Sequence, residues 1–210
     1  MLSRPLLLSP RHISPRQRQL NTATQCTRDV AQNQPSSCLF VCLGNICRSP
    51  AAEAVFRSIA ASNGLTSLRF DSCGTGGGSG SWYCDGGYSY HEGEDSDDRM
   101  KASAQRRGVD ITSRSRPLTP EDLTSFDLII AMDAKNVAAI KEAHKHWQSK
   151  GKSVPDDLSG KVKLMTDYSI KFKGATSVPD PYYGGEKGFE QVLDLLEDAS
   201  EGLVAEFKHE

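Results

Sequence analysis

The sequence has no long apolar run, no internal repeat and no large excess of charge of either sign. The longest apolar stretches, such as Leu128 to Met132, have the length of a strand, whereas a membrane-spanning helix needs about 18 consecutive apolar residues or more. Lysine and arginine number 25 against 27 aspartates and glutamates, and a net charge of −2 gives no electrostatic reason to expect nucleic-acid or anionic-membrane binding. Since 37% of the 210 residues are hydrophobic, the chain can bury one core. We therefore expect one folded domain, with no membrane span and no nucleic-acid partner.

Cysteine is scarce, and its spacing excludes two classes of protein. The six cysteines form no paired CxxC units and have no histidines at the spacing of a zinc site, and a core of this size needs no disulfide scaffold. We therefore expect no metal and interpret one or two cysteines as candidates for chemistry. The cysteines are Cys26, Cys38, Cys42, Cys47, Cys73 and Cys84.

Residues 1–34 contain no lysine and a single acid, Asp29, beside five arginines, so this segment carries +4 and the rest of the chain −6. The segment lacks the uninterrupted apolar region of a secretory signal, whereas an arginine-bearing, acid-poor composition is typical of an organellar transit peptide. We interpret it as a disordered leader that directs the chain to an organelle, to the chloroplast in preference to the mitochondrion. The alternative is a tail without a targeting signal, and in that case we expect a cytoplasmic protein.

From residue 35 onward the pattern alternates between strands and helices. Short apolar runs predict strands, and apolar residues repeated every three or four positions predict helices. The alternation is typical of a parallel sheet that helices cover on both faces, with ligands at the carboxyl ends of the strands. We therefore predict one α/β domain over residues 35–210. Strands are expected at 37–42, 67–73, 126–132 and 162–165, and helices from about 50, at 97–107, at 133–147 with Asp133 as the cap, and at 188–207.

Residues 74–96 interrupt this alternation with a glycine-rich insertion. Residues 74–93 hold eight of the 18 glycines of the chain together with four aromatic side chains, and glycine at this density favours neither helix nor strand. A long loop of this kind is either a flexible connector or a packed or substrate-facing loop, and the sequence leaves both interpretations open. His91 within it is interpreted as a solvated loop residue rather than a catalyst.

The stretch CLGNICRSP, residues 42–50, places a cysteine at the end of a strand and an arginine at the start of a helix. The residues between them can wrap into a cradle of inward-pointing backbone N–H groups, and Gly44 and Asn45 are the types best able to take positive φ. The helix dipole and the guanidinium of Arg48 would hold a tetrahedral oxyanion, and their positive potential favours the thiolate of Cys42. A thiolate beneath a bound phosphate is a nucleophile for phosphoryl transfer, and it requires no metal. Because a bare CxxxxxR pattern also occurs by chance around buried cysteines, the interpretation depends on the strand, glycine and helix that surround it.

A phosphate monoester also needs an acid that protonates its leaving oxygen, and the stretch VPDPYYGG offers Asp180. Two prolines flank this residue and restrict the local chain. Tyr182 and Tyr183 follow, where they could wall an aromatic leaving group. Taken alone, the same residues predict only a turn.

Together these two stretches resemble the low-molecular-weight protein tyrosine phosphatase family. VCLGNICRSP followed by AEAVFR (52–57) is similar to its phosphate-loop signature, DPYYG (180–184) to its acid loop, and FDLIIAMD (126–133) extends a likeness that covers about residues 37–207. The resemblance implies a flavodoxin-like three-layer sandwich with a four-stranded parallel sheet and a phosphate-binding loop after the first strand. It also implies an enzyme without cofactor that acts on phosphotyrosine-containing proteins or small aryl phosphates, and we expect a monomer.

The resemblance further implies a two-step mechanism. Cys42 would attack phosphorus and form a phosphocysteine, Arg48 would bind the equatorial oxygens, and Asp180 would protonate the leaving phenolate and then activate water. Ser49 would donate a hydrogen bond to the sulfur, and Asn45 with its partner at position 72 would brace the loop. The phosphate-binding residues would be Leu43, Gly44, Asn45, Ile46, Cys47, Arg48 and Ser49.

Around the substrate, the resemblance places a wall made of Ile46, Trp82, Tyr182 and Tyr183. In this family an aliphatic residue at the position of Ile46 is typical of members that act on phosphotyrosine, whereas threonine there is typical of relatives that act on phosphoarginine. Trp82 could equally be packed inside its own loop, and Ser72, the partner of Asn45, could be only a strand-end hydroxyl.

Cys47 lies inside the predicted loop and could form a reversible disulfide with Cys42 that protects the nucleophile from over-oxidation. The alternative for Cys47 is a small residue that packs the loop. Two features depart from the family pattern. The GGYSYHEG segment of the insertion looks like that of plant and algal relatives, and Arg107 stands where animal members have a histidine in the loop-bracing network.

Two other functions fit parts of the sequence. An arsenate reductase of the same fold would need further cysteines that relay a disulfide outward, and Cys73 and Cys84 form no compact pair of this kind. A phosphate-binding adaptor without catalysis is disfavoured because Cys42, Arg48 and Asp180 are all intact.

Overall fold

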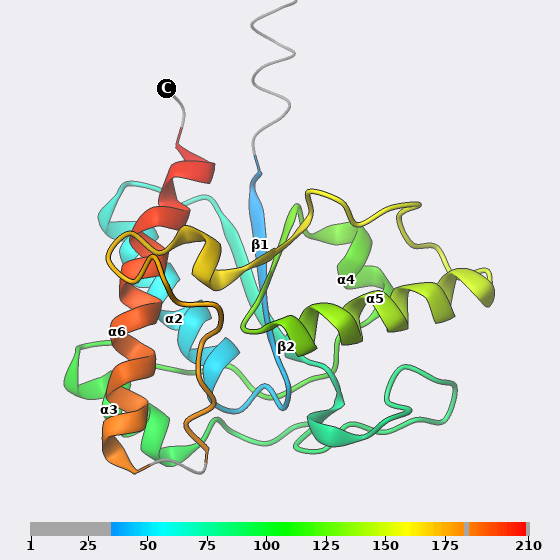
Figure 1. Cartoon of the computed structure of the whole chain (residues 1–210), viewed down its shortest axis with the longest axis horizontal. Helices are drawn as coiled ribbons and strands as arrows, with labels where there is room; N and C mark the ends of the chain where they lie inside the picture. The colour runs from blue at the N-terminus through cyan, green and yellow to red at the C-terminus, as the bar shows by residue number, and fades with distance from the viewer. Residues whose placement is uncertain (1–34, 183–184, 209–210) are drawn as a thin grey trace, which may run out of the picture. The chain divides into compact units, whose positions relative to one another are not determined.

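The computed structural model describes residues 35–182 and 185–208, and Figure 1 shows the path of the chain. The predicted leader, with Cys26, and the predicted wall residue Tyr183 lie outside these residues, so the transit peptide and the domain boundary at residue 35 stay predictions. The strands are β1 (Ser37–Cys42), β2 (Arg69–Gly74), β3 (Leu128–Ala131) and β4 (Val162–Leu164), and the α-helices are α2 (Arg48–Ser62), α3 (Asp98–Arg106), α4 (Pro120–Ser125), α5 (Ala134–Ser149) and α6 (Glu186–Leu203). The short 3₁₀ turns η1 (Gly76–Gly78), η2 (Met165–Tyr168) and η3 (Val204–Phe207) follow β2, β4 and α6.

The four strands form one parallel sheet in the order β2-β1-β3-β4. β1 lies in the interior of the sheet between β2 and β3, and Cys42 at its end is opposite Gly74. This is the order of a flavodoxin-like sheet, in which ligands bind where the strand order reverses, beyond the carboxyl ends of β1 and β3. The predicted α/β fold with four parallel strands is confirmed.

Helices cover both faces of this sheet. Figure 1 shows α2, α3 and α6 on one side and α4 and α5 on the other. β1 is buried along its whole length because its alternating side chains enter both layers. Phe40 packs against Phe56 of α2 on one face, whereas Leu39 belongs to the apolar cluster that contains Ile140 of α5 on the other. The continuous apolar run of this strand therefore reflects a sheet without a solvent face.

The predicted elements agree with the observed ones to within a few residues, with two differences. The sequence pattern does not predict α4, because six residues are too short to show a helical period, although a capping box of Thr119 and Asp122 starts it. α6 begins and ends earlier than predicted, and a 3₁₀ turn continues from it to Phe207. Asp133 caps α5, as predicted, by accepting a hydrogen bond from the N–H of Asn136 at 2.8 Å.

The glycine-rich insertion is a packed loop. Its Trp82 is 8% exposed and lies edge-on against Trp147 of α5, with 6.0 Å between ring centroids. The indole N–H of Trp147 donates to the carbonyl of Tyr83 at 2.9 Å. Gly76 has a φ of +87°, and a methyl group there would overlap the Trp82 indole, so glycine is required on both counts. Of the two interpretations that the sequence leaves open, the packed loop is the one observed.

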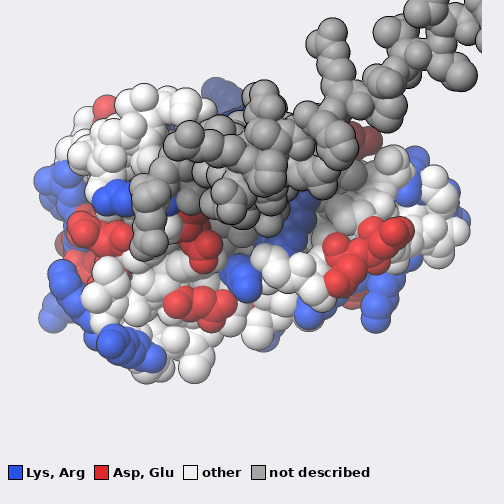
Figure 2. Space-filling view, turned by 90° about the horizontal axis from the view of Figure 1, so that it is seen from above, with Lys and Arg blue, Asp and Glu red and all other residues white. Residues whose placement is uncertain are grey.

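Figure 2 shows Lys and Arg side chains interspersed with Asp and Glu on one face of the molecule, without a continuous area of one sign among the described residues there. Charge on this face is therefore balanced locally by neighbouring opposite charges. Within residues 35–182 and 185–208, no helix is both long enough and apolar enough to cross a bilayer.

Candidate active site

The loop between β1 and α2 folds as a tight cradle. Asn45 takes a φ of +54°, as predicted for one of the two permissive residues. Gly44 does not take positive φ, so that part of the prediction is wrong. A Cβ at 44 would lie 3.3 Å from Cδ2 of His91, so glycine here allows the two loops to pack closely.

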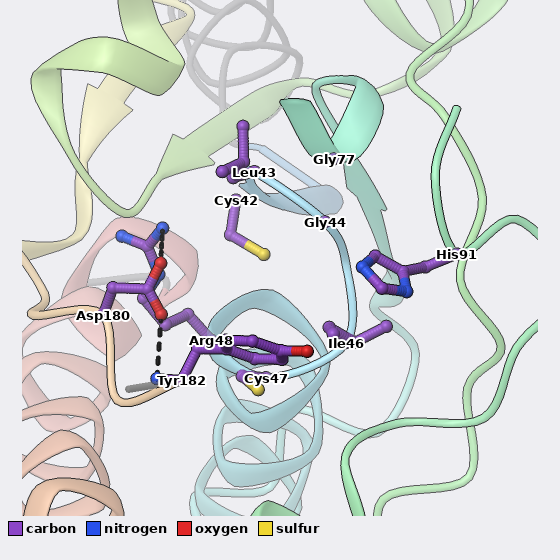
Figure 3. A pocket seen from close by; sticks show the side chains of 10 residues that line it. All are labelled: Cys42, Leu43, Gly44, Ile46, Cys47, Arg48, Gly77, His91, Asp180 and Tyr182. Atoms are coloured by element: carbon purple, nitrogen blue, oxygen red, sulfur yellow. Dashed lines mark hydrogen bonds and ion pairs between the residues drawn. The ribbon is translucent and has the colours of Figure 1, made fainter. Parts of the chain in front are cut away.

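Cys42 lies at the bottom of this cradle, 3% exposed, with its sulfur directed into the pocket in Figure 3. The Sγ accepts hydrogen bonds from the backbone N–H of Asn45 at 3.2 Å and from the hydroxyl of Ser49 at 3.1 Å. The first turn of α2 has neither an acidic residue nor a side-chain cap, so its backbone N–H groups are available to an anion. The sulfur and an oxyanion site therefore face each other, which is the arrangement for attack on a bound phosphate.

Arg48 begins α2 and is 4% exposed. Its Nη1 donates to Oδ2 of Asp133 at 2.7 Å and to the carbonyl of Val178 at 3.2 Å, and its Nη2 lies 3.4 Å from Oδ2 of Asp180. Burial by itself would lower the pKa of Arg48, but Cys42 and the carboxylates of Asp133 and Asp180 together raise it above its ordinary value. The guanidinium is therefore a fixed cation at the pocket.

Asp133 holds this guanidinium, a role that the sequence reasoning missed. One carboxylate oxygen accepts the N–H of Asn136 and caps α5, while the other accepts from Arg48. The available signal was its position directly after a buried strand, since the carboxyl ends of β1 and β3 meet at one edge of the sheet.

Asp180 lies on the rim of the pocket, with its side chain 46% exposed. Its Oδ1 accepts the backbone N–H of Tyr182 at 3.1 Å, one of the two contacts drawn in Figure 3. The loop is anchored beside it, where the N–H of Val178 donates to the carbonyl of Met132 at 2.8 Å. An exposed carboxyl on an anchored loop can exchange a proton with a substrate and with water.

These residues surround a small pocket of about 190 Å³, shown in Figure 3. It is lined by Cys42, Leu43, Gly44, Ile46, Cys47, Arg48, Gly77, His91, Asp180 and Tyr182. The structure thus brings the predicted nucleophile, arginine, acid and two of the predicted wall residues, Ile46 and Tyr182, to one place.

The wall of the pocket differs from the prediction at Trp82 and gains a residue that was not predicted. Trp82 does not line it, because its indole is buried against Trp147 and leaves no face for substrate. His91, which the sequence interpretation made a solvated loop residue rather than a catalyst, is a loop residue with its side chain 31% exposed, and it also lines the pocket. Its Nδ1 pairs with Oε2 of Glu94 at 2.7 Å and its φ is +69°, so the folding-back of the insertion sets its place and no local sequence signal does.

The loop is braced by a hydrogen-bond network centred on Asn45, which is 1% exposed. Its Nδ2 donates to the hydroxyls of Ser49 at 2.9 Å and Ser72 at 3.0 Å, and its Oδ1 accepts the backbone N–H of Arg116 at 3.0 Å. The Ser115 hydroxyl adds a bond to the carbonyl of Gly44 at 2.9 Å. Ser72 is therefore located where the family resemblance implies, beside Asn45.

Arg107, which stands where animal members of the family have a histidine of this network, takes no part in it, so the network differs here from the animal pattern. Arg107 forms ion pairs with Glu190, Asp194 and Glu197 of α6, which tie the end of α3 to that helix. The backbone of Arg116, which follows α3 and precedes α4, supplies the contact to the loop instead.

Cys47 lies at the start of α2 and is 4% exposed. Burial, followed by the nearby charges of Asp97 and Cys42, raises the pKa of its thiol well above the ordinary value. Cys47 is therefore a neutral thiol at physiological pH, and its predicted redox role stays a prediction.

The chain matches a family model described as low molecular weight phosphotyrosine protein phosphatase over residues 37–210. A relative from Synechocystis sp. is 44% identical over 167 residues, which cover 79% of this chain and 92% of the relative. A low molecular weight protein-tyrosine-phosphatase of Streptomyces coelicolor is 38% identical over 168 residues, which cover 79% and 90%. The crystal structure of a protein tyrosine phosphatase from Entamoeba histolytica superposes with a TM-score of 0.67 at 42% identity, covering 80% of this chain and 94% of that one.

Proposed function

The chain belongs to the low molecular weight phosphotyrosine protein phosphatase family, and on that premise we propose how its site removes phosphate from phosphotyrosine. The chain is a protein-tyrosine phosphatase. The observation that carries the mechanism is the position of the Cys42 sulfur beneath an uncapped helix N-terminus and beside the buried guanidinium of Arg48. We propose that the substrates are phosphotyrosine-containing proteins and also small aryl phosphates.

In the first step the Cys42 thiolate attacks phosphorus and forms an S–P bond, while the P–O bond to the tyrosine breaks. Asp180 transfers its proton to the departing phenolate oxygen. The N–H groups at the start of α2 and the guanidinium of Arg48 hold the phosphoryl oxygens, and their fixed positions stabilise the charge that develops in the transition state. Asp133 keeps the guanidinium in place throughout.

In the second step water attacks the phosphocysteine and Asp180 accepts its proton. The S–P bond breaks, inorganic phosphate forms, and the thiolate of Cys42 is the leaving group. Hydrogen bonds from the Ser49 hydroxyl and the Asn45 N–H to the sulfur stabilise that thiolate. The site is therefore restored without a cofactor.

The pocket walls favour an aromatic leaving group. Ile46, Tyr182 and the ring of His91 line the opening above the sulfur, and Tyr182 is 39% exposed. The cation of Arg99 lies 5.5 Å from the centroid of the Tyr182 ring and helps to orient it. A flat phenyl ring would pack between these groups with its phosphate directed at Cys42.

The arsenate reductase alternative is not supported. The matches in sequence and structure carry phosphatase names, and a disulfide relay needs an accessible second thiol. Cys73 is fully buried in β2, and burial raises the pKa of its thiol well above the ordinary value.

Hydrolysis of p-nitrophenyl phosphate in the presence of a chelator tests the mechanism. Cys42→Ser should lower kcat by at least about 10⁴-fold, because a hydroxyl without a base is a poor nucleophile. Cys84→Ser, in the insertion and away from the pocket, is the matched control and should retain activity. Substantial turnover by Cys42→Ser would show that another group attacks phosphorus.

We also propose that the enzyme is a monomer and that residues 1–34 direct it to the chloroplast. Light scattering of the purified chain tests the first proposal. A fluorescent fusion of residues 1–34 tests the second, and a fusion that stays in the cytosol would overturn it.

A further inference from the structure

Glu53 is a buried carboxylate for which the two-step reaction has no use. It lies on α2 within the AEAVFR stretch and is 4% exposed. Its Oε1 forms an ion pair with Arg57 one turn further along the helix, and its Oε2 accepts a hydrogen bond from the hydroxyl of Ser72 at 2.7 Å. A buried carboxylate is costly unless it is paired and hydrogen-bonded, so this placement needs both partners. The carboxylate connects α2 to the loop-bracing network.

An ionised carboxylate can only accept hydrogen bonds, so Glu53 fixes the direction of the bond that it shares with Ser72. The single hydroxyl proton of Ser72 must point to Glu53. The oxygen of Ser72 is then free to accept, and it accepts the amide of Asn45 at 3.0 Å. Glu53 therefore keeps Ser72 an acceptor toward Asn45.

The other end of the Asn45 side chain is also fixed, because the backbone N–H of Arg116 can only donate and it faces Oδ1 at 3.0 Å. With Oδ1 toward Arg116, both amide protons of Asn45 point to Ser72 and Ser49. A pure donor at one end and a pure acceptor at the other thus oppose the flipped orientation of this amide.

The orientation of the Asn45 amide affects the nucleophile through the hydroxyl of Ser49. Because the Ser49 oxygen accepts from Asn45, its own proton must go elsewhere, and its acceptors are Sγ of Cys42 at 3.1 Å and the carbonyl of Cys73 at 3.2 Å. In the flipped arrangement Oδ1 of Asn45 would compete for that proton and draw it away from the sulfur.

We propose that Glu53 is a positioning residue of this phosphatase, which holds Ser72 and Asn45 in the orientation that makes Ser49 donate to Cys42. The inference rests on the proposed roles of Cys42 and Ser49 in the reaction. Its effect falls on the charged sulfur, which is the nucleophile of the first step and the leaving group of the second.

Glu53→Gln in the full chain tests this, because it keeps the shape of the side chain but also offers an N–H₂ group that can donate to Ser72. We expect kcat for p-nitrophenyl phosphate and for a phosphotyrosine peptide to fall about tenfold, the value of one charge-assisted hydrogen bond. KM should change by less than about twofold, because the groups that bind phosphate are untouched. In a chain that already carries Ser49→Ala, adding Glu53→Gln should change kcat by less than about twofold, since the bond to the sulfur is already absent.

Asp198→Asn is the matched control for loss of a buried carboxylate. Asp198 is also 4% exposed and accepts three backbone N–H groups at Ile170, Lys171 and Phe172, remote from the pocket. This variant should lower thermal stability and leave kcat unchanged with or without Ser49→Ala. If Glu53→Gln fails to fold, Ser72→Ala replaces it, and the same absence of effect in the Ser49→Ala background is expected.

The inference is overturned if Glu53→Gln keeps the reference kcat, or if its loss is the same with and without Ser49→Ala. In either outcome the reference chain still depends on Cys42 and Ser49, so the proposed mechanism would survive. A reference chain that is insensitive to Cys42→Ser and Ser49→Ala would instead overturn the mechanism itself.

Discussion

Two loops leave the same edge of the sheet and meet at the pocket. They differ in the role of their glycines and in the hydrogen bonds that hold them. The phosphate loop, residues 43–47, joins β1 to α2, and its Asn45 side chain has a partner for every hydrogen-bonding group. The segment that joins β2 to α3, residues 75–97, contains nearly all of the glycine-rich insertion and is held by ring packing and by backbone hydrogen bonds. The short loop places reactive groups, and the long loop shapes what surrounds them.

The two loops are also in direct contact. The N–H of Gly77 donates to the carbonyl of Leu43 at 2.9 Å, and the N–H of Tyr90 donates to the carbonyl of Gly76 at 3.1 Å. A Cβ at Gly77 would approach Cβ of Tyr90 to 2.8 Å. Glycine at 77 therefore allows the insertion to fold closely on itself at the point where it bonds to the phosphate loop. The comparison predicts that changes in the phosphate loop affect the chemical step, and that changes in the insertion affect stability or substrate binding.

Apart from replacement of the nucleophile Cys42, Arg48→Lys should have the largest effect on catalysis. A lysine cannot reproduce the planar fork that contacts Asp133 and the carbonyl of Val178 while facing phosphate, so kcat/KM should fall about 10³-fold. Steady-state kinetics with a phosphotyrosine peptide measures it. Arg107→Lys, on the α3–α6 surface, is the control and should keep kcat/KM. A similar loss in both variants would break the assignment of chemistry to the phosphate loop.

Asp180→Asn should have the next largest effect, and it should depend on the leaving group. Asparagine keeps the shape but cannot give a proton, so kcat/KM for phosphotyrosine, which reports the first step and not the hydrolysis of the phosphocysteine, should fall about 10²-fold. The loss should be smaller for p-nitrophenyl phosphate, because nitrophenolate leaves without protonation. Comparison of the two substrates checks this. An equal loss for both would mean that Asp180 acts on something other than the leaving oxygen.

Gly76→Ala should lower the stability of the fold and leave kcat nearly unchanged. The new methyl group would overlap Trp82 at a backbone φ of +87°, and unfolding free energy should fall by about 3 kcal/mol. Gly80→Ala is the control, because open space surrounds that position, and it should stay within about 0.5 kcal/mol of the reference. Denaturant unfolding measures both, and kcat at a temperature well below unfolding should stay within about twofold. A large loss of kcat in Gly76→Ala would show that the insertion takes part in the chemical step.

His91→Ala should act on binding alone. The ring lines the opening of the pocket, so its removal should raise KM on the order of threefold and leave kcat unchanged. Kinetics with a phosphotyrosine peptide checks this. A drop in kcat with unchanged KM would move His91 from the wall of the pocket into the chemistry.

Asp97→Asn, at the cap of α3 directly after the insertion, should have the smallest effect on stability, and that effect should depend on pH. The side chain of Arg99 lowers the pKa of Asp97 below its ordinary value, against the opposing effect of burial. A carboxylate with a lowered folded pKa stabilises the protein above its unfolded pKa, and this contribution is lost as the pH falls through the folded value. The reference chain should therefore exceed Asp97→Asn by about 0.5 kcal/mol at neutral pH, with the difference closing in acid. Thermal unfolding of both proteins across a range of pH measures this difference in stability. A difference that grows as the pH falls would contradict the prediction.

Local patterns account for most of what the sequence predicts correctly. The strands and long helices follow from apolar runs and periodicity, and the phosphate loop is one contiguous stretch between a strand and a helix. Asp180 is predictable only from the likeness of DPYYG to the family's acid loop, because the same residues taken alone predict a turn. The failures are α4, too short to show a period, and Trp82, whose place depends on its contact with a distant segment. The lining of the pocket by His91 was not predicted for the same reason.

The sequence by itself predicted Cys42 and Arg48 as nucleophile and arginine from residue type and short-range spacing, and Asp180 as the acid from the likeness of its loop to that of the family. Only the tertiary structure decided that Asp133 holds Arg48, that His91 lines the pocket while Trp82 packs on α5, and that Glu53 reaches Ser72. These are contacts between segments far apart in the chain. They form because parallel strands bring the carboxyl ends of β1, β2 and β3 to one edge, and no pattern within a single segment contains that information.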